Sequence, residues 1–257
     1  MKTKLITTVI VCSMAFAVAQ AKTKIIAHRG YWKVQGSAHN TISALKNAQG
    51  IGVYGSELDV HLCNDGVLAV YHDNAIANHE ISDHPYQTIQ NFKLSNGEEI
   101  PTLESYIQQA KQARATKLII EIKPKNDSLL EASTVQAVVD MVKKHKMTSQ
   151  VEYISFSLQA CKQLVAMKVK SPVAFLASNA TALAPAELKK LGISGLDYHY
   201  SVLLKNPQWI IQAKQLKIST NCWTVNDVDI IKKLAAQGVD FITTDIPVEA
   251  QKAIREI

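Results

Sequence analysis

Short apolar runs alternate with amphipathic helical stretches along most of this 257-residue chain. Such alternation predicts repeated strand–helix units, which build a parallel sheet covered by helices. The eight strand candidates are Lys24–His28, Gly55–His61, Lys117–Lys123, Val151–Ser157, Val173–Leu176, Gly195–Tyr200, Ser219–Thr224 and Asp240–Thr243. The helix candidates are Asn40–Gln49, Thr102–Ala113, Leu130–His145, Leu158–Met167, Pro185–Leu191, Pro207–Gln215 and Val228–Gln237. We therefore expect a closed (β/α)8 barrel of the TIM type, with functional residues at the C-terminal ends of its strands.

One further apolar run, Val67–His72, breaks this alternation. Its separation from Gly55–His61 is too short for a parallel crossover, which needs roughly a dozen residues or more. The intervening Asn64–Gly66 is a hairpin turn signal, so we expect an antiparallel return strand whose paired residue numbers sum to about 130. That register would bring His72 back toward the carboxylates of the second strand. The next stretch, Asn74–Ile100, is expected to be a small irregular insertion near the barrel mouth.

The first residues have the pattern of an export signal. Lys2 and Lys4 precede an apolar run, and Ala19-Gln20-Ala21 offers a small-x-small cleavage site. We expect removal of residues 1–21, leaving residues 22–257 as a single domain that is periplasmic or secreted. The alternatives are a transmembrane anchor, for which the apolar run is short, and lipid modification of Cys12, which lacks the expected small residues before it.

Composition narrows the remaining classes of function. Loss of the two signal lysines lowers the formal net charge from +6 to +4. The basic residues are scattered along helices, so we expect no nucleic-acid partner. No later stretch is long enough to span a membrane, so we expect no stable membrane anchor. Cys63, Cys161 and Cys222 are odd in number and far apart, which indicates buried small residues rather than disulfides. The oligomeric state has no signal in the sequence.

Three carboxylates stand in the expected strands. Period-two geometry places Glu57 and Asp59 on one face of the second strand, and Glu121 ends the apolar run Leu118–Ile120. Carboxylates that converge at a barrel mouth repel one another and are costly to bury without a cation. Hard divalent cations prefer oxygen ligands. The sequence therefore predicts one divalent cation, Mg²⁺ or Ca²⁺, bound by these three residues.

Histidines and cations accompany the carboxylates. His28 and Arg29 follow the first apolar run, His72 closes the hairpin, and Lys123 shares the face of Glu121. Two histidines supply an acid and a base near neutral pH. Arginine and lysine can hold phosphate oxygens, and a divalent cation polarises phosphorus. The set indicates phosphoryl chemistry, in which one histidine deprotonates the attacking oxygen and the other protonates the leaving alkoxide. The histidines expected to be structural or exposed are His61, His79, His84 and His145.

The same residues belong to an ordered set of motifs. The set comprises Ala27–Gly30 (AHRG), Glu57–Val60 (ELDV), His72-Asp73, Ile100–Glu104 (IPTLE), Ile120–Lys123 (IEIK), Trp223–Asn226 (WTVN) and Ile242–Pro247 (ITTDIP). In this order, over nearly all of the mature chain, the sequence resembles the glycerophosphodiester phosphodiesterase family of exported bacterial type.

The resemblance implies a TIM-type barrel with a small insertion after the His-Asp motif, a divalent metal, and a small-molecule substrate. The implied reaction is hydrolysis of glycerophosphodiesters to sn-glycerol 3-phosphate and an alcohol, with either water or the glycerol 2-hydroxyl as the attacking group. By position, the family's functional residues fall on catalytic His28 and His72, phosphate-binding Arg29 and Lys123, Trp223 near the glycerol, and metal-binding Glu57, Asp59 and Glu121.

One stretch departs from the family. The first helix there often opens with Pro-Glu-Asn-Thr, whereas this chain has Ala38-His39-Asn40-Thr41. His39 replaces an acidic residue that usually lies close to the active site, and it either contacts metal or substrate or only lines the pocket. Asn40 is expected to cap the helix. The change affects metal preference and substrate fit more than the class of reaction.

Two other functions are weighed against the hydrolase. A phosphatidylinositol-cleaving phospholipase C type could share the barrel, the histidines and the Glu-x-Asp pair, but this chain shows no exposed apolar docking segment. A catalytically inactive phosphodiester-binding protein is favoured only by the replacement at His39. The weaker pocket candidates, each at a strand end, are Phe156-Ser157, Tyr198-His199 and Asn221.

Overall fold

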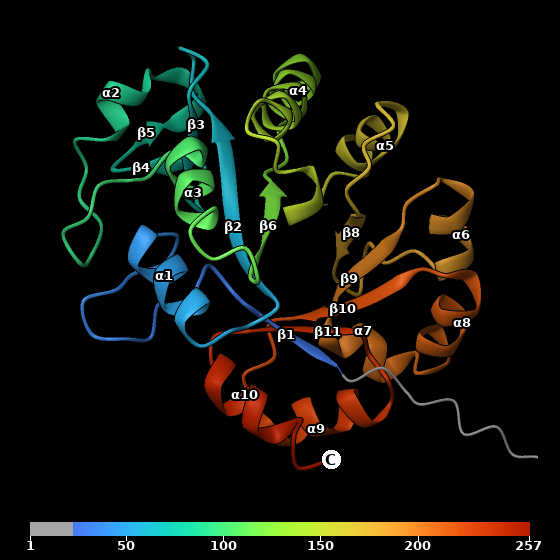
Figure 1. Cartoon of the computed structure of the whole chain (residues 1–257). Helices are drawn as coiled ribbons and strands as arrows, with labels where there is room; N and C mark the ends of the chain where they lie inside the picture. The colour runs from blue at the N-terminus through green and yellow to red at the C-terminus, as the bar shows by residue number, and fades with distance from the viewer. Residues whose placement is uncertain (1–22) are drawn as a thin grey trace, which may run out of the picture.

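The computed structural model describes residues 23–257, so the expected export signal lies outside the described part of the chain. Eight parallel strands follow one another around a closed barrel, because the last strand pairs with the first (Figure 1). They are β1 (Lys24–Ala27), β2 (Gly55–Leu62), β6 (Lys117–Ile122), β7 (Val151–Ser155), β8 (Val173–Ala177), β9 (Gly195–His199), β10 (Ser219–Trp223) and β11 (Phe241–Thr244). The predicted (β/α)8 barrel is confirmed.

Helices form an outer ring around these strands (Figure 1). The main ones are α1 (Ile42–Gly50), α3 (Leu103–Ala110), α4 (Ser128–Lys144), α5 (Leu158–Ala166), α6 (Pro185–Lys190), α8 (Gln208–Leu216), α9 (Val228–Ala236) and α10 (Pro247–Ala253). The sequence prediction lacked α10 and the short α7 (Tyr200–Lys205), which follows β9 without a break.

Period-two alternation in the strands divides the barrel into an apolar exterior and a mixed interior. Leu58 and Val60 of β2 join the large core between strands and helices. Inside the barrel, a small apolar cluster forms from Ile26, Ile119, Ile154 and Leu176. The carboxylates of β2 occupy the positions that alternate with Leu58 and Val60, and therefore point into the barrel.

The expected hairpin is present. Strand β3 (Leu68–Val70) runs antiparallel to β2, and its register pairs Val60 with Val70 and Leu62 with Leu68. The ladder continues with a bond from the Tyr71 amide to the Asp59 carbonyl, 3.1 Å long. The paired numbers sum to 130, as the turn predicted, and the hairpin returns His72 to the barrel mouth.

The insertion that follows is less irregular than the sequence suggested. It contains β4 (Ala75–Ile76), β5 (His79–Glu80), a 3₁₀ turn η1 (Ile81–Asp83) and α2 (Tyr86–Ile89). Its buried residues Ile81, Ile89 and Ile100 pack with Cys63 and Ala69 in a separate small core. These elements are too short to show a period in the sequence, which is why the prediction of an irregular segment was wrong in detail.

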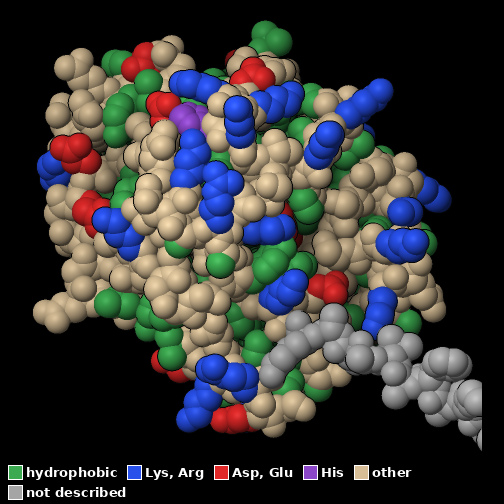
Figure 2. Space-filling view, viewed as in Figure 1, with side chains coloured by type: hydrophobic (Ala, Val, Ile, Leu, Met, Phe, Trp, Pro, Cys, Tyr) green, Lys and Arg blue, Asp and Glu red, His purple; other side chains and the backbone are tan. Residues whose placement is uncertain are grey.

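Within residues 23–257, no helix has the length and apolar character needed to cross a membrane. Basic side chains are scattered over the face shown in Figure 2, with acidic side chains among them.

Candidate active site

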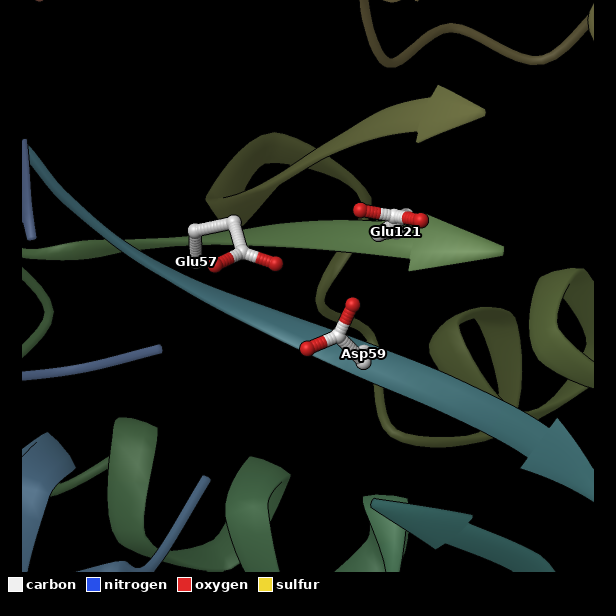
Figure 3. A group of neighbouring side chains, drawn as sticks. All are labelled: Glu57, Asp59 and Glu121. Carbon is white, nitrogen blue, oxygen red and sulfur yellow. The ribbon is translucent and has the colours of Figure 1, made fainter. Parts of the chain in front are cut away.

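Glu57 and Asp59 on β2 and Glu121 on β6 converge inside the barrel mouth (Figure 3). All three side chains are buried, and one oxygen from each lies within 4.8 Å of the others. The parallel pairing of β2 with β6 sets this arrangement, because Asp59 stands directly opposite Glu121 in the register. The structure thus brings together the three carboxylates that the sequence assigned to a metal.

The surroundings shift the pKa values of the three carboxyl groups in different directions. Burial, with the negative charges of Asp59 and Glu121, raises the pKa of Glu57 well above its usual range. Burial and the Asp59 charge also raise the pKa of Glu121 to about 7, although Lys123 opposes the shift. Burial would raise the pKa of Asp59 too, but the charge of Lys123 and a hydrogen bond from Asn40 outweigh it and lower that pKa. Burial and neighbouring charges thus raise the pKa of Glu57 and Glu121, whereas Lys123 and Asn40 lower that of Asp59.

The residues present fit a cation. Glu57 Oε2 accepts a hydrogen bond from the Arg29 amide at 2.7 Å. Its other oxygen, Oε1, is buried and has no hydrogen-bond partner among the described residues. A buried carboxylate oxygen without a partner is costly unless a proton or a cation meets it. Three carboxylates offer the hard oxygen ligands that Mg²⁺ and Ca²⁺ prefer.

A left-handed corner after β1 places Arg29 and Asn40 beside Asp59. Both residues have positive φ, 54° for Arg29 and 57° for Asn40, a conformation that costs energy outside glycine. The Asn40 amide donates to the Arg29 carbonyl at 3.0 Å. Asn40 Nδ2 donates to Asp59 Oδ2 at 2.8 Å, and Arg29 Nε lies 3.7 Å from the same oxygen. The expectation that Asn40 caps α1 was wrong, because the Thr41 side chain is the cap and Asn40 instead holds a carboxylate.

His28 directly follows β1 and is held by Asp245. His28 Nδ1 lies 2.8 Å from Asp245 Oδ1. Two further donors reach the same carboxylate, Trp32 Nε1 at 3.3 Å and Asn226 Nδ2 at 2.8 Å. Burial alone would raise the pKa of Asp245, but these hydrogen bonds and the His28 charge lower it far below its usual value. Asp245 therefore stays ionised, and the Nε2 of His28 is left available to a ligand.

His72 is supported in the same way at the end of the hairpin. Its Nδ1 lies 2.6 Å from Asp73 Oδ1. Burial lowers the pKa of His72, and the charge of Asp59 acts in the opposite direction. His72 lines a cavity of about 290 Å³ together with Arg29, His39 and Lys93. Both predicted catalytic histidines thus stand near the carboxylate cluster, each with one nitrogen bound to a carboxylate.

Lys123 and Trp223 occupy two different sides of the mouth. Lys123 Nζ lies 3.2 Å from Asp59 and 2.8 Å from Glu121, so it neutralises part of the cluster. Trp223 ends β10, four strands around the barrel from β6. Its Nε1 donates to the Asp197 carbonyl at 2.9 Å, and its ring packs edge-on against Phe156 and His199.

His39 lies beside the histidines and not within the carboxylate cluster. Its ring packs edge-on against Trp32, with the ring centroids 3.9 Å apart. Burial, with the positive charge of Arg29, lowers the pKa of His39. His39 is one of the residues that line the cavity.

The weaker pocket candidates lie in three different places: at the mouth, inside the barrel and between the strands and the outer helices. Ser157 caps α5, and Tyr198 is buried outside the barrel with its hydroxyl bonded to the Leu183 carbonyl. Asn221 is buried in the interior and donates to Thr243 at 3.0 Å. Phe156 and His199 remain beside Trp223 at the mouth.

Comparisons with known proteins agree with this geometry. The model of the glycerophosphoryl diester phosphodiesterase family matches residues 28–249. A glycerophosphodiester phosphodiesterase from Bacillus altitudinis is 30% identical over 251 residues, covering 91% of this chain and 98% of that protein. This chain belongs to the glycerophosphoryl diester phosphodiesterase family. The resemblance inferred from the motifs is confirmed, and the chain is classed as a phosphoric diester hydrolase.

Solved structures of the family share the fold. A glycerophosphodiester phosphodiesterase from Parabacteroides distasonis is 45% identical with a TM-score of 0.88, covering 91% of this chain and 98% of that one. A phosphodiesterase from Oleispira antarctica, solved in complex with the product sn-glycerol-3-phosphate, is 26% identical with a TM-score of 0.81. The match to that structure covers 91% of this chain and 97% of the other.

Three residues support the site in ways that the sequence prediction missed: Asp245 and Trp32 had no role in it, and Asn40 was expected only to cap a helix. Asp245 follows β11 directly, and its place after a strand end was a signal that could have found it. Asn40 and Trp32 had no such signal, because their contacts with Asp59 and Asp245 join residues 19 and 213 positions apart.

Proposed function

We propose that this phosphodiesterase releases sn-glycerol 3-phosphate by metal-dependent catalysis with two histidines. The observation that carries the proposal is the buried cluster of Glu57, Asp59 and Glu121, flanked by two histidines that are each bound to a carboxylate. Family membership favours this reaction over the phospholipase C type and over an inactive binding protein.

The three carboxylates are proposed to hold one divalent cation, Mg²⁺ or Ca²⁺. When bound, such a cation polarises the phosphoryl group and neutralises negative charge that develops on it. Lys123 sits against two of the carboxylates, and Arg29 approaches Asp59. Both side chains are therefore close enough to the cluster to hold the phosphate oxygens of a substrate.

His28 and His72 are proposed to transfer the protons. Asp245 and Asp73 each accept a hydrogen bond from a ring Nδ1, which leaves Nε2 of each histidine free to act on the substrate. One Nε2 takes the proton of the attacking oxygen, either water or the glycerol 2-hydroxyl. The other donates a proton to the oxygen of the leaving alcohol, since an alkoxide is a poor leaving group without one.

Trp223 is proposed to pack against the glycerol, beside Phe156 and His199, whose rings contact its own. The cavity lined by His39, His72 and Lys93 then receives the leaving alcohol. This assignment puts the two ends of a small diester on opposite sides of the carboxylate cluster.

Residues 1–21 are proposed to direct export of the chain to the periplasm or outside the cell. Their support is the basic start, the apolar run and the small-x-small site. Fractionation of cells that express the full chain, with N-terminal sequencing of the mature protein, tests this proposal. A cytoplasmic protein that retains residue 1 would contradict it.

The reaction is tested by measuring sn-glycerol 3-phosphate release from a panel of glycerophosphodiesters, beside phosphatidylinositol and glycerophosphoinositol. The expected result is glycerol 3-phosphate from diesters, with no cyclic inositol phosphate. Asp59→Asn should abolish most of the activity, whereas Glu249→Gln, an exposed control in α10, should leave it unchanged. Tight binding of the diesters without any turnover would overturn the proposal.

A further inference from the structure

A buried histidine outside the proposed catalytic set contacts the backbone of His72. His61 lies on β2 two residues beyond Asp59, and it is fully buried. Its Nε2 is 3.5 Å from the His72 carbonyl oxygen, a long hydrogen bond that joins β2 to the end of the hairpin. From the sequence, His61 is expected to be a structural or exposed histidine.

The other nitrogen of His61 faces a cation. Lys125 Nζ lies 2.8 Å from His61 Nδ1. An ammonium group can only donate, so Nδ1 must be the acceptor and the ring proton must sit on Nε2. The ring is thereby fixed in the tautomer that donates to the His72 carbonyl. Without Lys125, the ring could carry its proton on either nitrogen.

The backbone of Lys125 is fixed by a hydrogen bond to a buried glutamate. Its backbone amide donates to Glu131 Oε2 at 3.1 Å, and Ser157 Oγ donates to Glu131 Oε1 at 2.7 Å. Glu131 is buried in α4, and Ser157 is the cap of α5. Hydrogen-bonded residues therefore connect the start of α5 to the backbone of His72. In order, they are Ser157, Glu131, Lys125 and His61.

We propose that His61 and Lys125 are positioning residues for His72. His61 fixes the carbonyl of His72 and Asp73 fixes its ring, so that the free Nε2 stays aimed at the reaction centre. The proposal rests on the role given to His72 in the proposed function. Neither residue touches the substrate, and each acts only through His72.

The expected effect follows from geometry. Displacement of a catalytic group by about 1 Å can cost on the order of 10²-fold in rate. Loss of the His61 donor should therefore lower kcat by about 10-fold to 10²-fold and leave KM nearly unchanged. Metal binding should be retained, because the pair contacts no carboxylate of the cluster through a hydrogen bond among the described residues.

The test compares His61→Leu, which removes both nitrogens, with His61→Gln, whose amide can replace the Nε2 donor. Each is measured alone and in a His72→Ala background, with kcat, KM and calorimetric binding of Mg²⁺ and Ca²⁺ as readouts. Lys125→Met tests the tautomer contact without changing the buried ring. His79→Leu, a histidine of the insertion without contact to His72, is the matched control.

We expect a lower kcat in His61→Leu, a smaller decrease of kcat in Lys125→Met, and a kcat in His61→Gln that is close to that of the wild type. In the His72→Ala background, His61→Leu should add almost nothing. An active wild type whose kcat is unchanged by His61→Leu, or a loss that persists in His72→Ala, would overturn the positioning role while leaving the proposed function intact. Absence of turnover in the wild type would instead contradict the proposed function.

The tautomer of His61 can be measured directly, in an experiment that does not depend on enzyme activity. Nitrogen-15 NMR of the histidine side chains in the full chain should show His61 protonated at Nε2. A proton at Nδ1 would overturn the inference whatever the activity of the variants.

Discussion

Each proposed catalytic histidine has one ring nitrogen bound to an aspartate, which leaves the other nitrogen to exchange protons. Substitution His28→Ala or His72→Ala should lower kcat by about 10²–10⁴-fold, the range typical of general acid–base groups. Metal affinity should be nearly unchanged, because neither histidine belongs to the cluster of Glu57, Asp59 and Glu121. Steady-state kinetics with calorimetry on the same samples checks both expectations, with His79→Ala as the unaffected control.

Leaving-group dependence then separates the acid from the base. The alanine variant of the acid should lose less activity on a p-nitrophenyl diester, because nitrophenolate leaves without a proton. The variant of the base should lose as much on both substrates. Equal losses for both variants on both substrates would contradict a division of roles and would indicate that the histidines act mainly by binding phosphate.

The buried carboxyl of Glu121 makes cation binding depend on pH. Burial and the Asp59 charge raise its pKa to about 7, so a proton competes with the cation below that pH. Affinity for Mg²⁺ or Ca²⁺ should therefore fall by at least about tenfold from pH 8 to pH 6, the sign expected when a ligand must lose a proton to bind. Calorimetry in two buffers of different ionisation enthalpy measures the proton released.

Glu121→Gln should lower both the affinity and the number of protons released on binding. Equal affinity at the two pH values, with no proton release, would contradict the assignment of Glu121 as a ligand.

The turn between β1 and α1 fixes the backbone on which Arg29 stands, and Gly30, the next residue, packs closely against α1 in that turn. Gly30 has φ of +79°, and a Cβ there would lie 2.6 Å from the Ala44 Cβ and 2.8 Å from its carbonyl carbon. Gly36 has the same φ but nothing within 4 Å. Both alanine variants carry the strain of a left-handed residue, about 1–2 kcal/mol. Gly30→Ala should lower the free energy of unfolding by about 1–3 kcal/mol more than Gly36→Ala, because it also overpacks α1.

Urea unfolding measures this difference, and the activity of the folded Gly30→Ala protein should fall while that of Gly36→Ala should not. Equal free energies of unfolding for the two variants would contradict this prediction, because they would mean that the turn moves enough to accept the Cβ at position 30 without a cost.

Most elements could be predicted because their signals are local. Runs such as Lys117–Ile122 are apolar and bounded by turns, and the Asn64–Gly66 turn gave both the direction and the register of β3. Elements of the insertion escaped prediction because a strand of two residues, such as Ala75–Ile76, has no measurable period. Even the exact start of α1 depended on whether Asn40 or Thr41 was the cap.

Contacts within the site were predictable only where strand ends meet. Glu57, Asp59 and Glu121 could be brought together because parallel strands end at one edge of a barrel. The Asp245 support of His28 and the Asn40 support of Asp59 depend on loop conformations, including the positive φ of Asn40. From the sequence alone, an asparagine that caps a helix cannot be told from one, such as Asn40, whose side-chain amide donates a hydrogen bond to a carboxylate.

At the scale of the whole molecule, barrel closure joins the first and last strands and so brings His28 to Asp245, 217 positions away along the chain. Near the carboxylate cluster lie His28 after β1, His72 after β3 and Lys123 after β6. We propose that this mouth binds one divalent cation and needs it for turnover of a glycerophosphodiester.

The most direct test is sn-glycerol 3-phosphate release by the mature chain after exhaustive chelation, followed by return of single metals with calorimetric stoichiometry. We expect loss of turnover on chelation, recovery with Mg²⁺ or Ca²⁺ at one ion per chain, and no recovery in Asp59→Asn. Full turnover of the chelated protein, or equal recovery in Asp59→Asn, would contradict it.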